Sequence, residues 1–179
     1  MTILAFDTAT SFGAVAGISG GRVASNPRAG DLLAVVDELV DDPAMIERIV
    51  VGRGPGSFTS IRIGLAMARS LSLTLGVPVA GASTLDAFEG GVPVIDARRG
   101  EVFTVGPRVA KPEELDVAGK TLVGDGAVRY RDVFESRGAV VPPDNDDVHR
   151  PNPLLLIPHA GETIEPLYVR DPDAKPSAK

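Results

Sequence analysis

The sequence predicts an α/β protein with two lobes, the second smaller than the first. Over residues 2–80, short apolar runs and runs with helical spacing follow one another in the order βββαβαβ, which is typical of helices packed on a mixed sheet. From Val92 onward, apolar runs on both sides of an Arg-Arg-Gly turn indicate a β-hairpin and a new unit. We therefore expect a first lobe over residues 1–91, a second lobe over residues 92–170, and a disordered tail over residues 171–179.

The elements of the first lobe follow from apolar spacing and from the residues that bound each run. The range Leu32–Val40 carries a broad apolar stripe at helical spacing, and Asp31 precedes it as a candidate N-cap. A second helix is predicted over Ser60–Leu75, and Gly76 ends it. Apolar runs bounded by glycine, proline and hydroxyl residues predict five strands, at Thr2–Phe6, Ala14–Ile18, Arg22–Ser25, Ile49–Val51 and Val77–Ala80.

The second lobe is predicted from the hairpin VPVIDARRGEVFTV, which spans residues 92–105. Further along the chain, a short helix over Ala127–Ser136 lies between two predicted strands, Thr121–Val123 and Ala139–Val141. Residues 144–153 are polar and contain proline, so we expect a loop there. These elements are short, and the lobe they form is therefore predicted to be the smaller one.

Composition narrows the classes of function. The 179 residues are 44% hydrophobic and 23% charged, which predicts a folded globular chain rather than a disordered one. The absence of cysteine excludes disulfides, thiolate catalysis and thiolate metal sites, and it favours a cytoplasmic location. The apolar N-terminus has no basic region and is interrupted by Asp7, so we interpret it as a buried strand rather than a signal peptide.

Charge narrows the classes of partner. The net charge is −6, and the basic residues are scattered along the chain rather than gathered in one stretch. Binding to a phosphate backbone needs clustered lysine and arginine, so we expect any contact with nucleic acid to be made through a partner protein. No apolar run approaches the length of a membrane helix, and no membrane partner is expected.

The first candidate site is FDTAT, residues 6–10, at the end of the first predicted strand. Asp7 would leave a buried strand there, and Thr8 and Thr10 follow on the turn. A carboxylate and two hydroxyls in this arrangement can orient a metal-bound water and donate hydrogen bonds to a phosphate. The alternative interpretation is that these side chains only satisfy the amides of the turn.

The second candidate site is the glycine-rich stretch GRGPGSFTSIRIG, residues 52–64, immediately before the second helix. Gly54 and Gly56 let the backbone approach a ligand, and Ser57 or Thr59 lies where a helix N-cap belongs. The first amides of the helix could therefore bind an anion. No lysine follows the last glycine, which excludes the phosphate loop of nucleoside triphosphatases. The alternative is a tight turn whose glycines only start a buried helix.

The remaining candidates for chemistry are few. A charged cluster between Asp96 and Glu101 lies at the predicted hairpin tip, where it would bind a polar ligand or a partner, or form a solvated turn. His149 and His159 lack metal-ligand spacing, and we predict them to be surface residues. No GxSxG nucleophile elbow is present. We therefore predict no catalytic residue and no metal site in this chain.

Four stretches occur in order over most of the chain and together resemble one family. They are ILAFDTAT at residues 3–10, GRGPGSFTSIRIGLAMARSL at residues 52–71, IDARRGEVF at residues 95–103 and EPLYVR at residues 165–170. In these stretches the sequence is similar to the TsaB (YeaZ) family, the bacterial tRNA threonylcarbamoyladenosine biosynthesis proteins. The resemblance implies the actin-like ATPase fold (ASKHA, ribonuclease H-like), in which two lobes are each built on a mixed sheet.

The resemblance also implies a function. TsaB proteins are paralogues of the catalytic subunit TsaD, and they act with TsaD and the ATPase TsaE to transfer a threonylcarbamoyl group to the adenosine next to the anticodon of tRNA. The chain would then be a non-catalytic partner subunit that meets tRNA only through the complex. No cofactor is assigned, and the sequence leaves open whether ADP or ATP binds in the complex. The residues leave open a free-standing kinase or metallopeptidase of this fold, and a homodimeric binding module that never meets TsaD.

Departures from the catalytic relative limit what the site is expected to do. TsaD holds its metal partly through an HxxxH pair, and in the matching stretch GASTLDAF Thr84 and Phe88 stand at those positions. Neither residue can replace a histidine ligand, so the resemblance implies no metal. The segment after the hairpin is short, which implies a shortened second lobe. The glycine loop would be a vestigial or weak phosphate site, with the residues Asp7, Thr8, Thr10, Gly54, Gly56 and Ser57.

The second helix predicts a partner surface. Over residues 59–75 its only charges are Arg62 and Arg69, one heptad apart, and a helix this apolar is covered on more than one side. One face would pack on the sheet of its own lobe, through Ile61, Gly64, Leu65, Ala68, Leu71 and Leu75. The other face, together with the first helix, would form half of a helical bundle with TsaD or with a second copy. The expected interface residues are Leu32, Val36, Ile63, Met67, Ser70 and Thr74.

Overall fold

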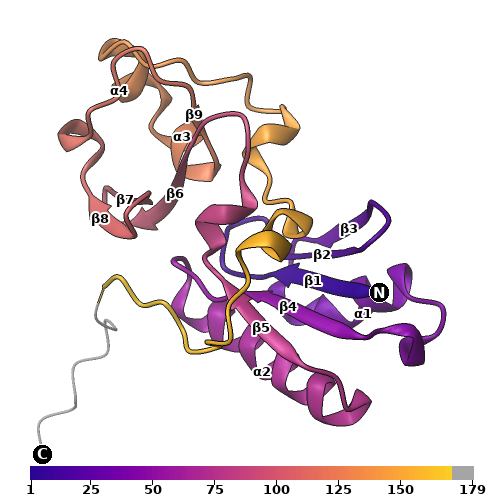
Figure 1. Cartoon of the computed structure of the whole chain (residues 1–179). Coiled ribbons are helices and arrows are strands. Elements are labelled where there is room, and N and C mark those ends of the chain that lie inside the picture. The colour runs from indigo at the N-terminus through magenta and orange to yellow at the C-terminus, as the bar shows by residue number, and fades with distance from the viewer. Residues whose placement is uncertain (171–179) are drawn as a thin grey trace, which may run out of the picture.

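The structure, a computed structural model, describes residues 1–170, so the predicted disordered tail over residues 171–179 lies outside the described residues. The chain folds into two lobes, each built on its own sheet (Figure 1). The first sheet has five strands and the second has four, and each contains both parallel and antiparallel neighbours. The α/β class and the two mixed sheets predicted from the sequence are therefore confirmed.

The first sheet has the strand order β3-β2-β1-β4-β5. Its first three strands form an antiparallel meander, and β1, β4 and β5 run parallel to one another. The last strand begins two residues later than the sequence predicts, because Val77 still closes the preceding helix by donating its amide to the carbonyl of Ser72. The strands are β1 (Ile3–Asp7), β2 (Ala14–Ile18), β3 (Arg22–Asn26), β4 (Arg48–Gly52) and β5 (Val79–Ala82).

Two helices, α1 (Leu32–Leu39) and α2 (Phe58–Leu75), pack on one face of this sheet. Alternation along β1 shows how the faces divide. Leu4 and Phe6 pack with the helices, whereas Ile3 and Ala5 pack in a second core on the opposite face. The first lobe is therefore layered, with helices on one face and the rest of the chain on the other.

The ends of the helices agree in part with the sequence predictions. Ser57 is the N-cap of α2, and its side chain accepts a hydrogen bond from the amide of Ser60. Gly76 ends α2 in the left-handed conformation, with a φ of 68°. Asp31 is the N-cap residue of α1, as predicted, but its side chain makes no capping hydrogen bond, and the residue also ends the 3-10 turn that leads into the helix.

The second lobe has the strand order β8-β7-β6-β9. The hairpin is β6 (Val92–Arg98) with β7 (Glu101–Thr104), followed by β8 (Arg108–Ala110) and β9 (Leu122–Val123). The predicted single helix is broken at Tyr130 into α3 (Asp125–Arg129) and α4 (Arg131–Ser136). The predicted strand over Ala139–Val141 is only a bridge between Val140 and Thr121, and β8 was not predicted at all. Phe134, fully buried, anchors the core of this lobe.

The last part of the described chain returns to the first lobe. Residues 153–160, which were predicted to belong to the second lobe, lie against the face of the first sheet that the helices leave open (Figure 1). Leu156 is buried there with Ile3 and Ala5, and Gly161 forms an antiparallel bridge with Gly81 at the end of β5. Past β5 the chain turns to the helical side, where Ile164 packs against the core under α1 and α2. The remaining turns are 3-10 segments: η1 (Ala29–Asp31), η2 (Pro43–Met45), η3 (Thr84–Ala87), η4 (Pro112–Glu114), η5 (Asp147–His149) and η6 (Pro153–His159).

Candidate functional site

The end of β1, the glycine loop and the turn after β5 meet at one buried carboxylate. Asp7 is only 1% exposed. Its Oδ2 accepts the hydroxyl of Thr84 at 2.6 Å, and its Oδ1 accepts the amide of Ala9 at 2.7 Å. The Thr84 Oγ1 in turn accepts the amide of Gly54 at 3.0 Å. A continuous chain of hydrogen bonds therefore joins three segments that lie far apart in the sequence.

The surroundings of Asp7 set its protonation. Burial raises the pKa of its carboxyl above the ordinary value, and the hydrogen bonds from Thr84 and Ala9 offset only part of that effect. Both carboxylate oxygens already accept hydrogen bonds from the protein. Asp7 is therefore placed to hold segments together.

The glycines of the loop are required because the backbone lies against the FDTAT segment. A methyl carbon added at Gly52 would lie 1.7 Å from Asp7 Oδ2, and one added at Gly56 would lie 2.2 Å from the carbonyl oxygen of Ala9. Inside α2, a methyl carbon at Gly64 would lie 2.5 Å from Thr8 Oγ1. Contacts this short cannot be relieved without moving the backbone or a buried side chain. In this structure the space beside each of these glycines is filled by the protein itself.

Hydrogen bonds fix the same packing. The amide of Ser57 donates to the carbonyl of Ala9 at 2.8 Å, and the hydroxyl of Thr8 donates to the carbonyl of Ser60 at 2.6 Å. Thr10 is buried too, and its Oγ1 accepts the amide of Phe12 at 3.4 Å within the turn.

The predicted phosphate residues are thus brought together in space. Asp7, Thr8, Gly54, Gly56 and Ser57 form one cluster, and Thr10 follows on the adjoining turn. Asp7 and Thr10 satisfy amides of their own turn, as the alternative interpretation predicts, but Asp7 also accepts the hydroxyl of Thr84, and Thr8 donates to the carbonyl of Ser60. Their role toward a phosphate stays a prediction.

The positions that match the histidine pair of TsaD are filled by groups without metal-binding atoms to spare. Thr84 is fully buried, and its hydroxyl is engaged by Asp7 and Gly54. Phe88 packs in the core between the lobes. Within residues 1–170, no three histidine, cysteine or acidic side chains gather closely enough to hold a metal ion.

A histidine that the sequence analysis placed on the surface is buried. His149 is 1% exposed, so that prediction is wrong. Its Nδ1 accepts the amide of Gly124 at 3.1 Å, and its Nε2 lies 3.0 Å from the carbonyl oxygen of Pro142. The ring therefore ties the segment before η6 to the start of α3. A proline-rich polar stretch gives no sequence signal for such burial.

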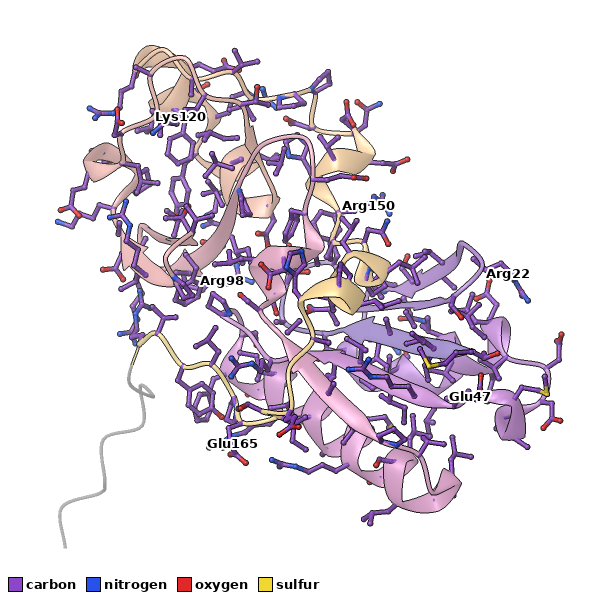
Figure 2. All side chains as sticks on the ribbon, viewed as in Figure 1. Arg22, Glu47, Arg98, Lys120, Arg150 and Glu165 are labelled. Atoms are coloured by element: carbon purple, nitrogen blue, oxygen red, sulfur yellow. The ribbon has the colours of Figure 1, made fainter. Side chains whose placement is uncertain are left out.

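A cleft of about 490 Å³ lies between the two lobes, with the glycine loop on one side and the β6–β7 hairpin on the other. Ser11 and Asp125 bridge the cleft by a hydrogen bond of 2.6 Å. Two residues of the predicted charged cluster, Asp96 and Arg98, line it, and Figure 2 shows Arg98 on the side of the second lobe that faces the first. The side chain of Asp96 is 6% exposed and pairs with Arg98 at 3.3 Å and Arg129 at 3.6 Å. Asp96 is therefore not part of a solvated hairpin tip.

The C-terminal EPLYVR stretch forms a strap across the cleft mouth, which local sequence patterns did not predict. The amide of Leu167 donates to the carbonyl of Arg53 at 2.7 Å. The ring of Tyr168 stacks on Phe58 with centroids 4.5 Å apart. Arg170 then crosses to the second lobe, where it pairs with Glu101 and donates to the carbonyl of Ala97. The strap is therefore attached to both lobes.

The predicted partner surface on α2 is only partly as expected. The face predicted to pack on the sheet does so, since Ile61, Gly64, Leu65 and Ala68 are buried. The outward face is exposed at Ala66, Ser70 and Thr74, and half-buried at Ile63 and Met67. Its most exposed apolar side chain is Leu73, at 85%, which the sequence analysis did not select.

Two predicted interface residues of α1 do not reach the surface. Leu32 and Val36 are buried against the sheet of their own lobe, so neither is available to a partner. The apolar residue that α1 does expose is Leu33, at 47%. The charged stripe of α2 also has a different role, because Arg69 pairs with Glu165 at 3.1 Å and donates to the carbonyl of Ile164. It therefore holds the C-terminal segment.

The fold and the site define a class of protein. Two lobes with mixed sheets meet at a cleft, and a glycine loop after the second parallel strand starts the longest helix. This is the actin-like arrangement known as the ASKHA fold. No helix within residues 1–170 is long and apolar enough to span a bilayer.

Comparisons with known proteins agree with this class. The family model described as "TsaD: tRNA N6-adenosine threonylcarbamoyltransferase" matches residues 22–136. An uncharacterised protein of Mycobacterium tuberculosis is 35% identical over 210 aligned positions, covering 99% of this chain and 95% of the relative. The tRNA threonylcarbamoyladenosine biosynthesis protein TsaB of Escherichia coli is 35% identical over 126 positions, covering 58% of this chain and 53% of the relative.

Among solved structures, YeaZ from Pseudomonas aeruginosa superimposes with a TM-score of 0.71 at 24% identity, covering 93% of this chain and 99% of that one. The near-complete coverage shows that the two chains share the fold throughout. The chain belongs to the TsaB (YeaZ) family.

Proposed function

We propose that this chain is a non-catalytic partner subunit of TsaD in the formation of threonylcarbamoyladenosine in tRNA. Family membership supports the proposal, since relatives from Bacillus subtilis, Escherichia coli and Haemophilus influenzae are named as tRNA threonylcarbamoyladenosine biosynthesis proteins TsaB. In this proposal TsaD performs the transfer, TsaE supplies the ATPase activity, and tRNA is bound only by the assembled complex. We place the complex in the cytoplasm, in keeping with a chain that contains no cysteine.

The observation that carries the proposal is that the glycine loop hydrogen-bonds to, and packs against, other segments of the same chain. Two amides of the loop, those of Gly54 and Ser57, donate to protein oxygens, and its glycines lie against the FDTAT segment. Thr84 stands where TsaD has a metal ligand, and its hydroxyl is bonded to Asp7. These contacts support a scaffold role for residues that a catalytic relative would direct at a nucleotide and a metal. If ADP or ATP binds here, we expect it to need the complex.

The outer face of α2, on which Arg62 and Arg69 are the only charges, is the surface that we propose for TsaD. This helix is 18 residues long. Apart from Arg62 and Arg69, its exposed side chains are small or apolar: Thr59, Ala66, Ser70, Leu73 and Thr74. Leu73 stands out from it at 85% exposure, and Leu33 adds an exposed leucine from α1. An exposed face of this kind gains stability by packing against another helix. The half-buried Ile63 and Met67 lie at its margin, with Ser70 and Thr74 on the face itself.

A titration with purified TsaD tests this surface. We expect Leu73→Glu to abolish a micromolar complex, because an uncompensated charge buried in an interface costs several kcal/mol. Leu73 is a sharper probe than Met67, since Met67 also packs on the core of its own lobe and its replacement would disturb the fold. The matched control is Val140→Glu, which puts the same charge on a 58% exposed apolar residue of the second lobe.

The outcome separates the alternatives. Wild-type affinity in a folded Leu73→Glu chain would remove this face of α2 from the TsaD interface. The same face could instead pair two copies of the chain, so sedimentation of the chain alone should be measured beside the titration. A dimer that persists in the presence of TsaD would favour the homodimeric module over the partner subunit.

A cellular experiment tests the function itself. Depleting the chain should remove threonylcarbamoyladenosine from tRNA, which mass spectrometry of digested tRNA measures. An unchanged level, in a cell without a second TsaB gene, would contradict the proposed function.

A further inference from the structure

A second groove, of about 510 Å³, lies between the β2–β3 hairpin and residues 146–155. It is distinct from the interlobe cleft and from the outer face of α2. Its lining is about half apolar, and the apolar part includes Phe12, Val15, Val23 and Leu155. Figure 2 shows Arg150 near the point where the C-terminal segment leaves the second lobe toward the first. The groove therefore separates an edge of the first sheet from the segment that joins the two lobes.

One wall of the groove is a sheet edge that charge and proline protect only at its two ends. β3 is the outermost strand, and within the described residues its only strand partner is β2. Proteins commonly protect such an edge with proline, lysine or a covering segment. Arg22 begins this strand and Pro27 follows it, but the three residues from Val23 to Ser25 have neither proline nor charge, and the side chain of Val23 is 45% exposed. The backbone groups on its outer side are thus available to a further strand.

The sheet face beside that edge is suited to apolar side chains. Val15 pairs with Ser25 across the two strands and Gly17 pairs with Val23, so Val15, Val23 and Ser25 share one face. Ala14 and Ala16 point the other way, into the core under α1. An extended segment lying along the outer edge of β3 would therefore place every second side chain on the groove side of the sheet, beside Val23 and Ser25.

The opposite rim of the groove is acidic. Glu89, Asp146 and Asp147 line it, against a single cation, Arg150. Arg150 Nε lies 3.8 Å from an Asp147 oxygen, and its guanidinium is over the ring of Phe12. The rim therefore carries excess negative charge beside an apolar floor. A cationic segment complements it, whereas a phosphate backbone or a second copy of the same rim would be repelled.

We propose that this groove binds an extended basic segment of a partner protein, which adds to β3 as a further strand. The five residues of β3 can pair with a segment of similar length, about 17 Å when extended. Backbone hydrogen bonds would supply the strand pairing, and the side chains on the groove side of the added strand would be lysine or arginine, whose apolar stems would lie beside Val23 and whose charges would face the acidic rim. The proposal is independent of the surface that we propose for TsaD, which is the outer face of α2 on the helical side of the same lobe.

A labelled peptide tests the proposal on the full chain. The probe is a fluorescein-labelled heptapeptide of alternating lysine and valine, and the comparison is the heptapeptide of alternating glutamate and valine. We expect saturable binding of the basic peptide by fluorescence anisotropy, weaker binding as salt is raised, and no saturable binding of the acidic one. Amide shifts in NMR spectra should concentrate in Val23–Ser25 and in residues 146–150.

Charge-reversal variants supply the decisive comparison. Glu89→Lys with Asp147→Lys should lower the affinity of the chain for the basic peptide by about tenfold, since two attractive contacts become repulsive. The control, Glu113→Lys with Glu162→Lys, changes the same charge at two exposed positions outside the groove and should keep wild-type affinity. Equal binding of both peptides, an unaffected double reversal, or shifts confined to another surface would overturn the proposal. If the wild-type chain forms a dimer and Glu89→Lys with Asp147→Lys makes it monomeric, the groove binds a second copy of the chain. That result would also overturn the proposal.

Discussion

Replacing Gly64 by alanine gives a sharp test of the idea that the glycines serve packing. In an ordinary helix interior this change stabilises by about 1 kcal/mol. Here the added methyl carbon would lie 2.5 Å from Thr8 Oγ1, and that hydroxyl is held by its 2.6 Å hydrogen bond to the carbonyl of Ser60. Overpacking of this kind costs roughly 1–3 kcal/mol. We therefore expect Gly64→Ala to lower the free energy of unfolding by about 1 kcal/mol.

The neighbour can be removed to reverse the sign. In Thr8→Ala the hydroxyl is gone, and the next atom, the Cβ of residue 8, lies at an ordinary contact distance of 3.6 Å. Adding Gly64→Ala to that background should then stabilise by about 1 kcal/mol, the helix preference alone. The two substitutions are thus coupled by about 2 kcal/mol.

Denaturant unfolding of the four proteins measures this coupling. The control is Gly30→Ala, where nothing lies within 4 Å of the added carbon, and its unfolding free energy should change little. If Gly64→Ala stabilises the wild-type chain, or if the two changes are simply additive, the glycine is not retained for its contact with the FDTAT segment.

Three further predictions concern other parts of the molecule. Because the pKa of Asp7 is raised in the folded chain, its protonated side chain stabilises the fold fully at pH values below the ordinary pKa of 3.8, and this contribution is lost as pH rises through the folded-state pKa. The free energy of unfolding of the wild type, measured relative to that of Asp7→Asn, should therefore fall as pH rises. Parallel pH curves for the two proteins would contradict this. Phe134→Ala should destabilise by about 3–5 kcal/mol in thermal or denaturant unfolding, because the side chain is fully buried, and a loss below about 1 kcal/mol would show that the second lobe is not packed around it. Tyr168→Ala removes the ring stack on Phe58 and the acceptor for Arg62, so amide exchange of Leu167 should accelerate with little change in global stability; unchanged exchange would show that the stack does not hold the strap.

Much of the first lobe could be predicted from the sequence, because the local spacing of apolar residues determines its helices and strands. The strands β2 and β4 and both helices fall within about two residues of their predicted ranges. The spacing also identified which side of α2 is buried. It could not say what covers a given face, and for that reason Leu32 and Val36 were assigned to a partner although their own sheet buries them.

Residue types and their order in the sequence identified the candidate site. They could not predict that its side chains and amides hydrogen-bond to one another. Asp7 and Thr84 are 77 residues apart, and only the parallel pairing of β1, β4 and β5 brings them together. The strap over Leu167–Arg170 depends likewise on contacts with residues about a hundred positions earlier, such as Arg53 and Phe58. The break between α3 and α4 could not be predicted, because the residue at the break is Tyr130 rather than proline or glycine.

Reconstitution of the transfer reaction tests the central claim most directly. Purified TsaD and TsaE from the same organism, with tRNA and the threonylcarbamoyl donor, should form threonylcarbamoyladenosine when this chain is added, as measured by mass spectrometry of the digested tRNA. The chain alone should form none, and Leu73→Glu should reduce formation where Val140→Glu does not. Equal product without the chain, or product from the chain in the absence of TsaD, would contradict its role as a non-catalytic partner subunit.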